Sequence, residues 1–288
     1  IRAALIEAGF DAGMIDIAPF YADTLRMGLE KGADVFTILM RTSQPEDAAA
    51  FEQWSTTLSE SMRVYRVTPK AETPVNAYAY PALTPRGTGV HEVQSLPEAD
   101  KALDQIRQSL IAQYGGEYDY EEFSARIAVP EGMTGYLNDE NTQGDNRDTS
   151  YLMTNDFTLN SDEDFVVVYG VNHVAAGKAT YANTVLYPRP RLNGIVSLYD
   201  SMYGDSAAEY LPDVDSSKYY VLKMARTALD SHTAVIPYST DNPNGRFYGA
   251  DNGTQLLIAY RAYVEPETGV GPSYYEIVYD RAIVFHKK

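Results

Sequence analysis

The chain of 288 residues contains no cysteine, which excludes disulfide bonds and cysteine-ligated zinc as sources of stability. The absence of cysteine is compatible with the cytosol and with many exported bacterial proteins. No apolar run approaches the roughly 18 residues that a transmembrane helix needs, so we expect no insertion into a membrane.

Signature motifs of common enzyme classes are also missing. The sequence has no G-x-G-x-x-G after an expected strand, no Walker loop and no G-x-S-x-G. Its four histidines include no pair at the spacing of three to five residues that is typical of zinc ligands. Motifs therefore leave open whether the protein is an enzyme.

Positive charge is scarce, with 23 Lys and Arg against 40 Asp and Glu, a net charge of −17. Nucleic acids and anionic membranes attract basic surfaces, so we expect neither as a partner. An acidic surface suits divalent cations, basic partners, or simple solubility at high salt or in a secretory setting, and a solvated acidic surface is the alternative to any specific role. The chain begins with Ile1, and a removed signal peptide would explain this start, as would proteolysis. We expect an extracellular or periplasmic location, with the cytoplasm as the alternative.

Tyrosine, by contrast, is abundant, at 24 residues against nine Phe and one Trp. Its apolar ring and polar tip suit half-exposed strands, protein interfaces and sugar-binding surfaces. Strand propensity alone also explains the enrichment. The hydrophobic content of 44% is enough for a sizeable core.

Strand patterns separated by turn clusters dominate the chain from about residue 132. Residues 165–187 predict two buried strands joined in a hairpin at 175–178. Short strands with such turns favour an antiparallel β-sandwich or jelly-roll-like region over βαβ units. The expected strands are 151–159, 165–174, 179–187, 194–199, 219–225, 234–238, 255–264 and 274–285.

The preceding region mixes helix and strand patterns. A stripe of apolar residues from Ala99 to Leu110 predicts a helix that ends at Gly115, with Ser95 and Glu98 as its capping box. We expect a β-rich α+β fold, with residues 1–131 packed on the antiparallel region 132–288, as two domains or one compact domain. The other expected helices are 1–10, one carrying Phe51, Trp54 and Leu58, and 120–126; the other expected strands are 35–40, 63–67 and 76–80.

Residues 138–148 gather four carboxylates and four side-chain amides around a glycine, and such oxygen ligands favour calcium. The loop is not an EF-hand, because Ser150 stands where a bidentate Glu is required. A solvated turn is the alternative. The candidate metal ligands are Asp139, Asn141, Asp145 and Asp148.

Three residues are candidates for acid–base chemistry: His173, Tyr181 and His91. His173 follows the buried strand 165–174, where a hydrogen-bonded structural histidine is the alternative. His91 follows the glycine-rich turn 86–89, which we expect, with the turn 268–272, either to frame a ligand site or to form plain loops. No spacing rule links the three.

Two functions remain open. The first is an exported binding or assembly module that contacts protein or glycan through a tyrosine-lined surface, with calcium as a candidate stabilising ion. The second is a secreted carbohydrate-active enzyme, a lyase or hydrolase that uses His, Tyr and carboxylate groups. An enzyme should have a concave pocket in which these groups meet.

Overall fold

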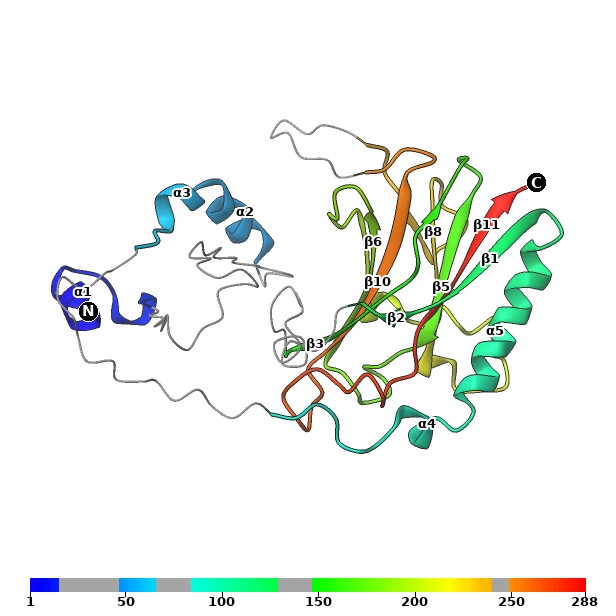
Figure 1. Ribbon diagram of the computed structural model, residues 1–288, viewed down its shortest axis with the longest axis horizontal. Helices are drawn as coiled ribbons and strands as arrows, with labels where there is room; N and C mark the ends of the chain where they lie inside the picture. The colour runs from blue at the N-terminus through cyan, green and yellow to red at the C-terminus, as the bar shows by residue number, and fades with distance from the viewer. Residues whose placement is uncertain (16–46, 66–83, 129–146, 240–248) are drawn as a thin grey trace, which may run out of the picture. The chain divides into compact units, whose positions relative to one another are not determined.

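The computed structural model describes residues 1–15, 47–65, 84–128, 147–239 and 249–288 (Figure 1). The chain divides into two compact units, residues 1–82 and residues 83–288. The described part of the first unit contains three short α-helices, α1 (Arg2–Glu7), α2 (Ala48–Thr56) and α3 (Leu58–Ser61), and one 3₁₀ helix (Ala12–Met14). The expected strands 35–40 and 76–80 lie outside the described residues, and residues 63–65 form no regular structure.

The second unit contains two β-sheets. The first sheet has the strand order β1-β11-β5-β8-β9 and the second β2-β3-β10-β6-β7, with β4 pairing β10. All pairs are antiparallel except β8 with β9. The first sheet comprises β1 (Tyr118–Ser124), β5 (Phe165–Val171), β8 (Tyr219–Ala225), β9 (Thr233–Val235) and β11 (Arg281–Lys287). The second comprises β2 (Arg126–Ile127), β3 (Thr149–Met153), β4 (Phe157–Thr158), β6 (Tyr181–Pro188), β7 (Val196–Tyr199) and β10 (Gln255–Tyr263).

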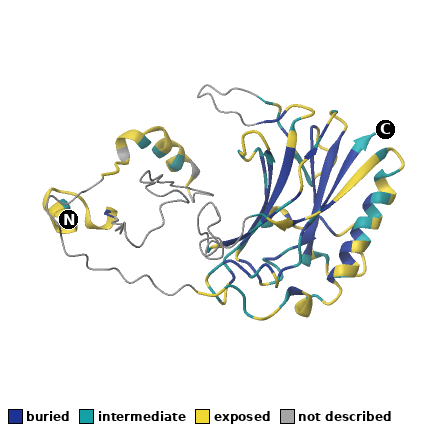
Figure 2. Ribbon diagram, in the orientation of Figure 1, coloured by how far each residue is buried: buried dark blue, intermediate teal, exposed yellow. Residues whose placement is uncertain are grey.

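The expected β-rich α+β fold is confirmed: the described strands form a sandwich-like pair of sheets and no closed barrel (Figure 1). On β5, alternate residues face opposite layers, as the period of a strand requires. Val166 and Val168 pack between the sheets, whereas Val167 and Tyr169 face helix α5 (Ala99–Tyr114). β5 is therefore buried on both faces (Figure 2).

Helix α5 confirms the apolar stripe seen in the sequence. Leu103, Ile106 and Leu110 are fully buried against the first sheet. The helix is capped at its C-terminal end by Gly115. The predicted capping box is wrong, because Ser95 belongs to a separate short helix, α4 (Glu92–Ser95), and no side chain caps the N-terminus of α5.

Two other predictions from local pattern are wrong. The segment expected as a helix at 120–126 forms β1 and the start of β2, and β1 pairs with β11 along its whole length. Tyr118 and Tyr120 contact the ring of Phe285, and these cross-strand aromatic contacts favour the strand. The expected hairpin at 165–187 is also absent, because β5 and β6 lie in different sheets and residues 172–180 cross between them.

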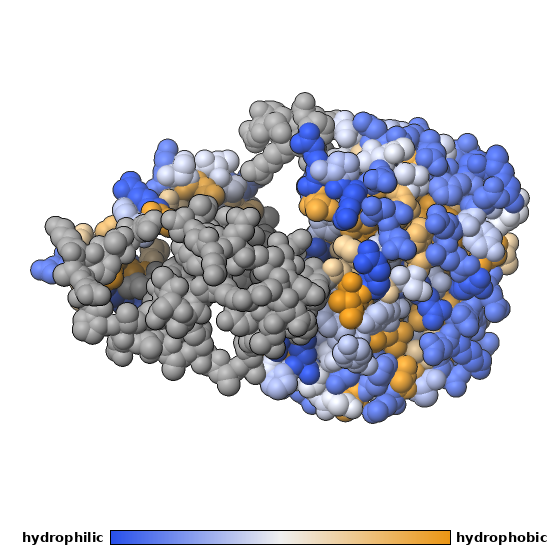
Figure 3. Space-filling model, viewed as in Figure 1, coloured by the Kyte–Doolittle hydropathy of each residue, from blue (hydrophilic) through white to orange (hydrophobic). Residues whose placement is uncertain are grey.

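Hydrophilic side chains cover much of the second unit on the face shown in Figure 3, in keeping with the acidic composition. None of the helices in the described ranges is both long and apolar enough to cross a bilayer.

Replacing Leu103 with Ala should lower the free energy of unfolding by about 2–5 kcal/mol. The substitution removes methyl groups packed between α5 and the first sheet, and the surrounding side chains fill only part of the cavity that it leaves. The matched control is Gln108→Ala on the exposed side of the same helix, with an expected change within about 0.5 kcal/mol. Urea denaturation of both variants measures the difference. Equal stabilities would contradict the assignment of α5 to the core.

Candidate functional site

Three irregular segments, residues 84–91, 172–180 and 264–280, meet at one end of the sandwich. They adjoin the end of β5, the start of β6, the end of β10 and the start of β11. The Glu92 amide, at the start of α4, donates a hydrogen bond of 2.8 Å to the Glu276 carbonyl, which joins the first segment to the third. Six ionisable side chains from these segments and α4 form what we call the end cluster: Glu92, His173, Lys178, Glu265, Glu276 and Asp280.

His173 lies between two carboxylates inside the end cluster. Its Nδ1 is 2.7 Å from Glu92 Oε1, and its Nε2 is 3.6 Å from Asp280 Oδ2. The other carboxylate oxygen of each acid also accepts a hydrogen bond. Glu92 Oε2 accepts from the Val278 amide at 2.7 Å, and Asp280 Oδ1 accepts from the Tyr220 hydroxyl at 2.6 Å. The side chain of His173 is only 5% exposed, so this network is closed to solvent.

The electrostatics of this network favour a charged imidazole. Burial by itself would lower the pKa of His173, but the carboxylates of Glu92 and Asp280 outweigh it and hold the pKa well above the ordinary 6.5. Burial together with the Asp280 charge raises the pKa of Tyr220, and of Tyr203 stacked on it at 4.2 Å. These phenols therefore stay protonated at neutral pH.

Lys178 forms the second half of the end cluster. Its Nζ donates to Glu265 Oε1 and to Glu276 Oε2, each at 2.6 Å. The Glu276 carboxylate also accepts the amides of Thr88 at 3.0 Å and Gly89 at 2.8 Å. Burial opposes the charge on Lys178, yet its hydrogen bonds to the two carboxylates raise its pKa. The lysine is thus an ammonium ion with its donors directed at internal acids.

The two glycine-rich turns of the sequence do lie together here. Gly87 has a φ of +87°, and a Cβ at this position would overlap the Glu276 carboxylate. A Cβ at Gly271 would overlap the Arg86 guanidinium and the Thr149 backbone. The turns are therefore closely packed against charged groups rather than arranged around an opening.

The structure places the candidate catalytic residues in separate environments. His91 is the N-cap of α4, where its Nδ1 accepts from the Val93 amide at 3.4 Å, and the neighbouring Glu92 reaches His173. Tyr181 lies on the outer face of the second sheet, where its hydroxyl accepts from Asn183 at 3.0 Å. Catalytic roles for His173, Tyr181 and His91 stay predictions.

Three of the candidate metal ligands, Asp139, Asn141 and Asp145, lie outside the described residues. The fourth, Asp148, is exposed immediately before β3, and its carbonyl accepts from the Val264 amide at 2.8 Å. Within the part of the chain that the structure describes, no group of three His, Asp or Glu side chains is arranged to hold a metal. Calcium binding stays a prediction.

Sequence reasoning missed four members of the end cluster: Glu92 as a partner of His173, and Glu265, Glu276 and Asp280 altogether. Glu92 is 81 residues from His173, and Glu276 is 98 residues from Lys178. No local spacing connects residues so far apart. The one available signal is Lys178 itself, a cation close to buried strands that requires an acidic partner.

A second feature lies on the outer face of the second sheet, where tyrosines surround Arg261 of β10. Arg261 Nη2 donates to the Tyr187 hydroxyl at 2.7 Å, and its guanidinium is 5.3 Å from the ring centre of Tyr151. The register places Arg261 directly opposite Tyr151 on β3 and Asn183 on β6. We name as the Tyr/Arg face the residues Tyr151, Tyr181, Asn183, Tyr187, Tyr199, Arg261 and Tyr263.

The rings of this face form cross-strand contacts. Tyr181 is 5.3 Å from Tyr263 and 6.2 Å from Tyr199 between ring centres, with interplanar angles of 36° and 30°. All five tyrosines are half-buried, so each ring packs against the sheet and keeps some surface in solvent. Tyr and Arg are enriched in the cores of protein interfaces, so this composition is that of a contact surface.

No family model matches the chain, and no solved structure matches it. Two curated proteins are similar to part of it: the probable ribonuclease FAU-1 of Pyrococcus horikoshii and that of Pyrococcus abyssi. Each is 30% identical over 111 residues, which is 37% of this chain and 22% of the relative. The chain thus spans about a fifth of the length of these relatives, and the similarity shows no family.

The free energy of unfolding should fall as the pH rises from about 6.5 through the higher folded-state pKa of His173. The pKa is raised in the folded state, so this stabilisation is fully present below the unfolded value and is lost above it. Urea unfolding across this range measures the effect.

The comparison uses a variant in which Glu92→Gln, His173→Gln and Asp280→Asn are combined, which keeps hydrogen-bonding groups but removes the charges. This variant should lose that pH dependence. The control, His232→Gln at a partly exposed histidine, should retain it. An NMR titration that gives His173 an ordinary pKa would contradict the charged network.

Proposed function

We propose that this protein is a binding or assembly module, with the Tyr/Arg face as its contact surface and another protein as its partner. The two β-sheets serve as its scaffold, held at one end by the buried ion pairs of the end cluster. The single observation that carries the proposal is the contrast between the two features. The ionisable groups of the end cluster are directed at one another, whereas the tyrosine rings keep surface in solvent.

The residue composition of the face favours protein over glycan as the partner. Tyr and Arg are enriched in the cores of protein interfaces and among their hot spots. The Tyr/Arg face combines the two residue types, with five half-buried tyrosines around Arg261.

The carbohydrate-active enzyme is the second interpretation of the chain. It would require His173 to reach a substrate, and His173 is held between Glu92 and Asp280 with 5% of its side chain exposed. Tyr181 has its own partners on the Tyr/Arg face. We rank this function below the binding module for that reason.

A ribonuclease activity is a further candidate, supported by the partial similarity to the two probable ribonucleases. The net charge of −17 opposes it, because RNA binding draws most of its affinity from Lys and Arg contacts to phosphates. We therefore propose that the chain does not bind nucleic acid.

Two further properties belong to the proposal. We propose an export location because the composition is acidic. We propose a calcium ion bound by the loop 138–148 because the carboxylate and amide oxygens of that loop are the ligands that calcium prefers.

A photo-crosslinking residue in place of Tyr187 should give a protein adduct of defined mass in an extract of the source cells, read by mass spectrometry. The same residue in place of Tyr275, which is 81% exposed outside the face, should give none. Adding Arg261→Ala should lower the adduct at least about tenfold, as for an interface hot spot. Equal adducts at both positions, or cleavage of RNA or oligosaccharide by the purified chain, would contradict the proposal.

Calcium should raise the melting temperature of the chain, and EDTA should return it to the lower value, because an ion that binds only the folded state stabilises it by mass action. At a concentration about 100 times the Kd the gain is about 2.7 kcal/mol. Asp139→Asn with Asp145→Asn should abolish the shift, whereas Glu267→Gln, an exposed acid elsewhere, should leave it unchanged. Identical melting curves with calcium and with EDTA would remove calcium from the proposal.

A further inference from the structure

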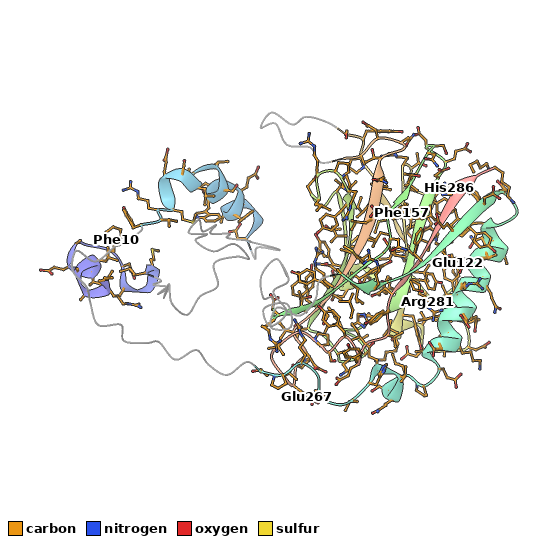
Figure 4. All side chains as sticks on the ribbon, viewed as in Figure 1. Phe10, Glu122, Phe157, Glu267, Arg281 and His286 are labelled. Atoms are coloured by element: carbon orange, nitrogen blue, oxygen red, sulfur yellow. The ribbon has the colours of Figure 1, made fainter. Side chains whose placement is uncertain are left out.

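A groove runs between helix α5 and the outer face of the first sheet, at the edge formed by β1. It is open to solvent on one side and has a volume of about 280 Å³. Figure 4 labels Glu122 and Arg281, which lie on the strands next to α5. The groove is lined by Asp104, Arg107, Glu122, Phe123, Ser124, Tyr169 and Arg281.

This groove interrupts an interface that is otherwise apolar. Elsewhere α5 packs through Leu103 and Ile106 on Ile283 and its apolar neighbours. At the groove a polar row crosses the sheet instead, with Ser124 of β1 opposite Arg281 of β11, and Arg281 opposite Tyr169 of β5. Apolar side chains would close such a corner at the density of a protein interior. The polar row leaves a cavity there.

The two arginines of the groove are engaged to different degrees. Arg107 donates from Nε and Nη2 to both oxygens of Glu122, at 2.5 and 2.7 Å. Arg281 has one carboxylate hydrogen bond, to Asp104 at 3.2 Å, and a looser ion pair with Asp100 at 3.6 Å. The side chains of these two acids are 63% and 84% exposed, and ion pairs with exposed acids are weak. A ligand anion can therefore displace them from Arg281.

Tyr169 lines the floor of the groove, and its side chain is almost fully buried there, at 1% exposure. Burial raises the pKa of Tyr169 to about 12, although the neighbouring Arg281 opposes the rise and hydrogen-bonds the phenol. The hydroxyl therefore stays protonated at neutral pH. Its oxygen accepts from Arg281, so its hydrogen can donate to an anion that displaces Asp104 and Asp100 from the guanidinium.

We propose that this groove binds a small zwitterion of the α-amino-acid class. Its carboxylate takes the Arg281 guanidinium and the Tyr169 hydroxyl, and its ammonium group takes the carboxylates of Glu122 and Asp104. Phe123 provides an apolar wall for the side chain of the ligand. This inference does not depend on the Tyr/Arg face.

Charge and size both select this class. Glu122 and Asp104 repel a simple anion, and the guanidinium groups of Arg107 and Arg281 repel a simple cation, so a ligand with one charge of each sign fits best. A cavity of about 150 Å³ holds benzene. A groove of about 280 Å³ thus has room for a free amino acid with a medium-sized side chain.

The test is isothermal titration calorimetry of the full chain with each of the twenty free amino acids at millimolar concentration. Two analogues of the tightest ligand follow: its N-acetyl form, which lacks the ammonium charge, and its amide, which lacks the carboxylate. At least one amino acid should bind, and both analogues should bind at least tenfold more weakly. No binding by any amino acid, or an N-acetyl form that binds equally well, would overturn the proposal.

Three variants locate the binding on the protein. Tyr169→Phe removes a single hydroxyl and Arg281→Met removes the guanidinium, and each should weaken binding at least tenfold. The control is Arg189→Met, which breaks a surface ion pair with Asp156 outside the groove and should leave the affinity unchanged. If Arg281→Met fails to fold, Tyr169→Phe decides. Unchanged affinity in Tyr169→Phe would overturn the assignment.

Discussion

The end cluster depends on two buried cations that are each held by two carboxylates. Taking an ion out of water costs several kcal/mol, and attraction between buried charges recovers this only when the geometry is close and the remaining donors and acceptors are used. His173 and Lys178 meet the first part of that condition through Glu92, Asp280, Glu265 and Glu276. One buried acceptor, Glu265 Oε2, has no hydrogen-bond partner among the described residues. Because the partners of the two cations come from different segments, the position of each segment depends on the others.

The same pairing determines where the ionisable groups of the end cluster are directed. The imidazolium and the ammonium are already paired with internal acids, and Tyr220 donates to Asp280. Groups used in this way hold the scaffold in shape but leave little for a ligand. The two recognition sites that we propose, the Tyr/Arg face and the polar groove beside α5, therefore lie on the faces of the sandwich, away from the end cluster.

Local patterns predicted the elements whose burial repeats with a fixed period. The stripe through Leu103 and Ile106 specified α5, and the run of branched residues specified β5. The helix expected at 120–126 is wrong, because Tyr118–Ser124 pairs as a strand with β11, which follows 157 or more residues later in the chain. The partners of His173 and Lys178 escaped for the same reason: long-range pairing leaves no periodic trace in a single sequence.

Buried ion pairs are a weak source of stability, since well-packed apolar residues often do as well. In this protein the ion pairs instead help to fix the positions of the segments that carry them. Residues 84–91, 172–180 and 264–280 contain no strand, so no ladder of backbone hydrogen bonds sets where they lie. A buried carboxylate unpaired from His173 or Lys178 is costly, so arrangements of the three segments that separate these charges are disfavoured. The end cluster therefore favours the observed conformation of the connections between the two sheets, to which regular secondary structure contributes little.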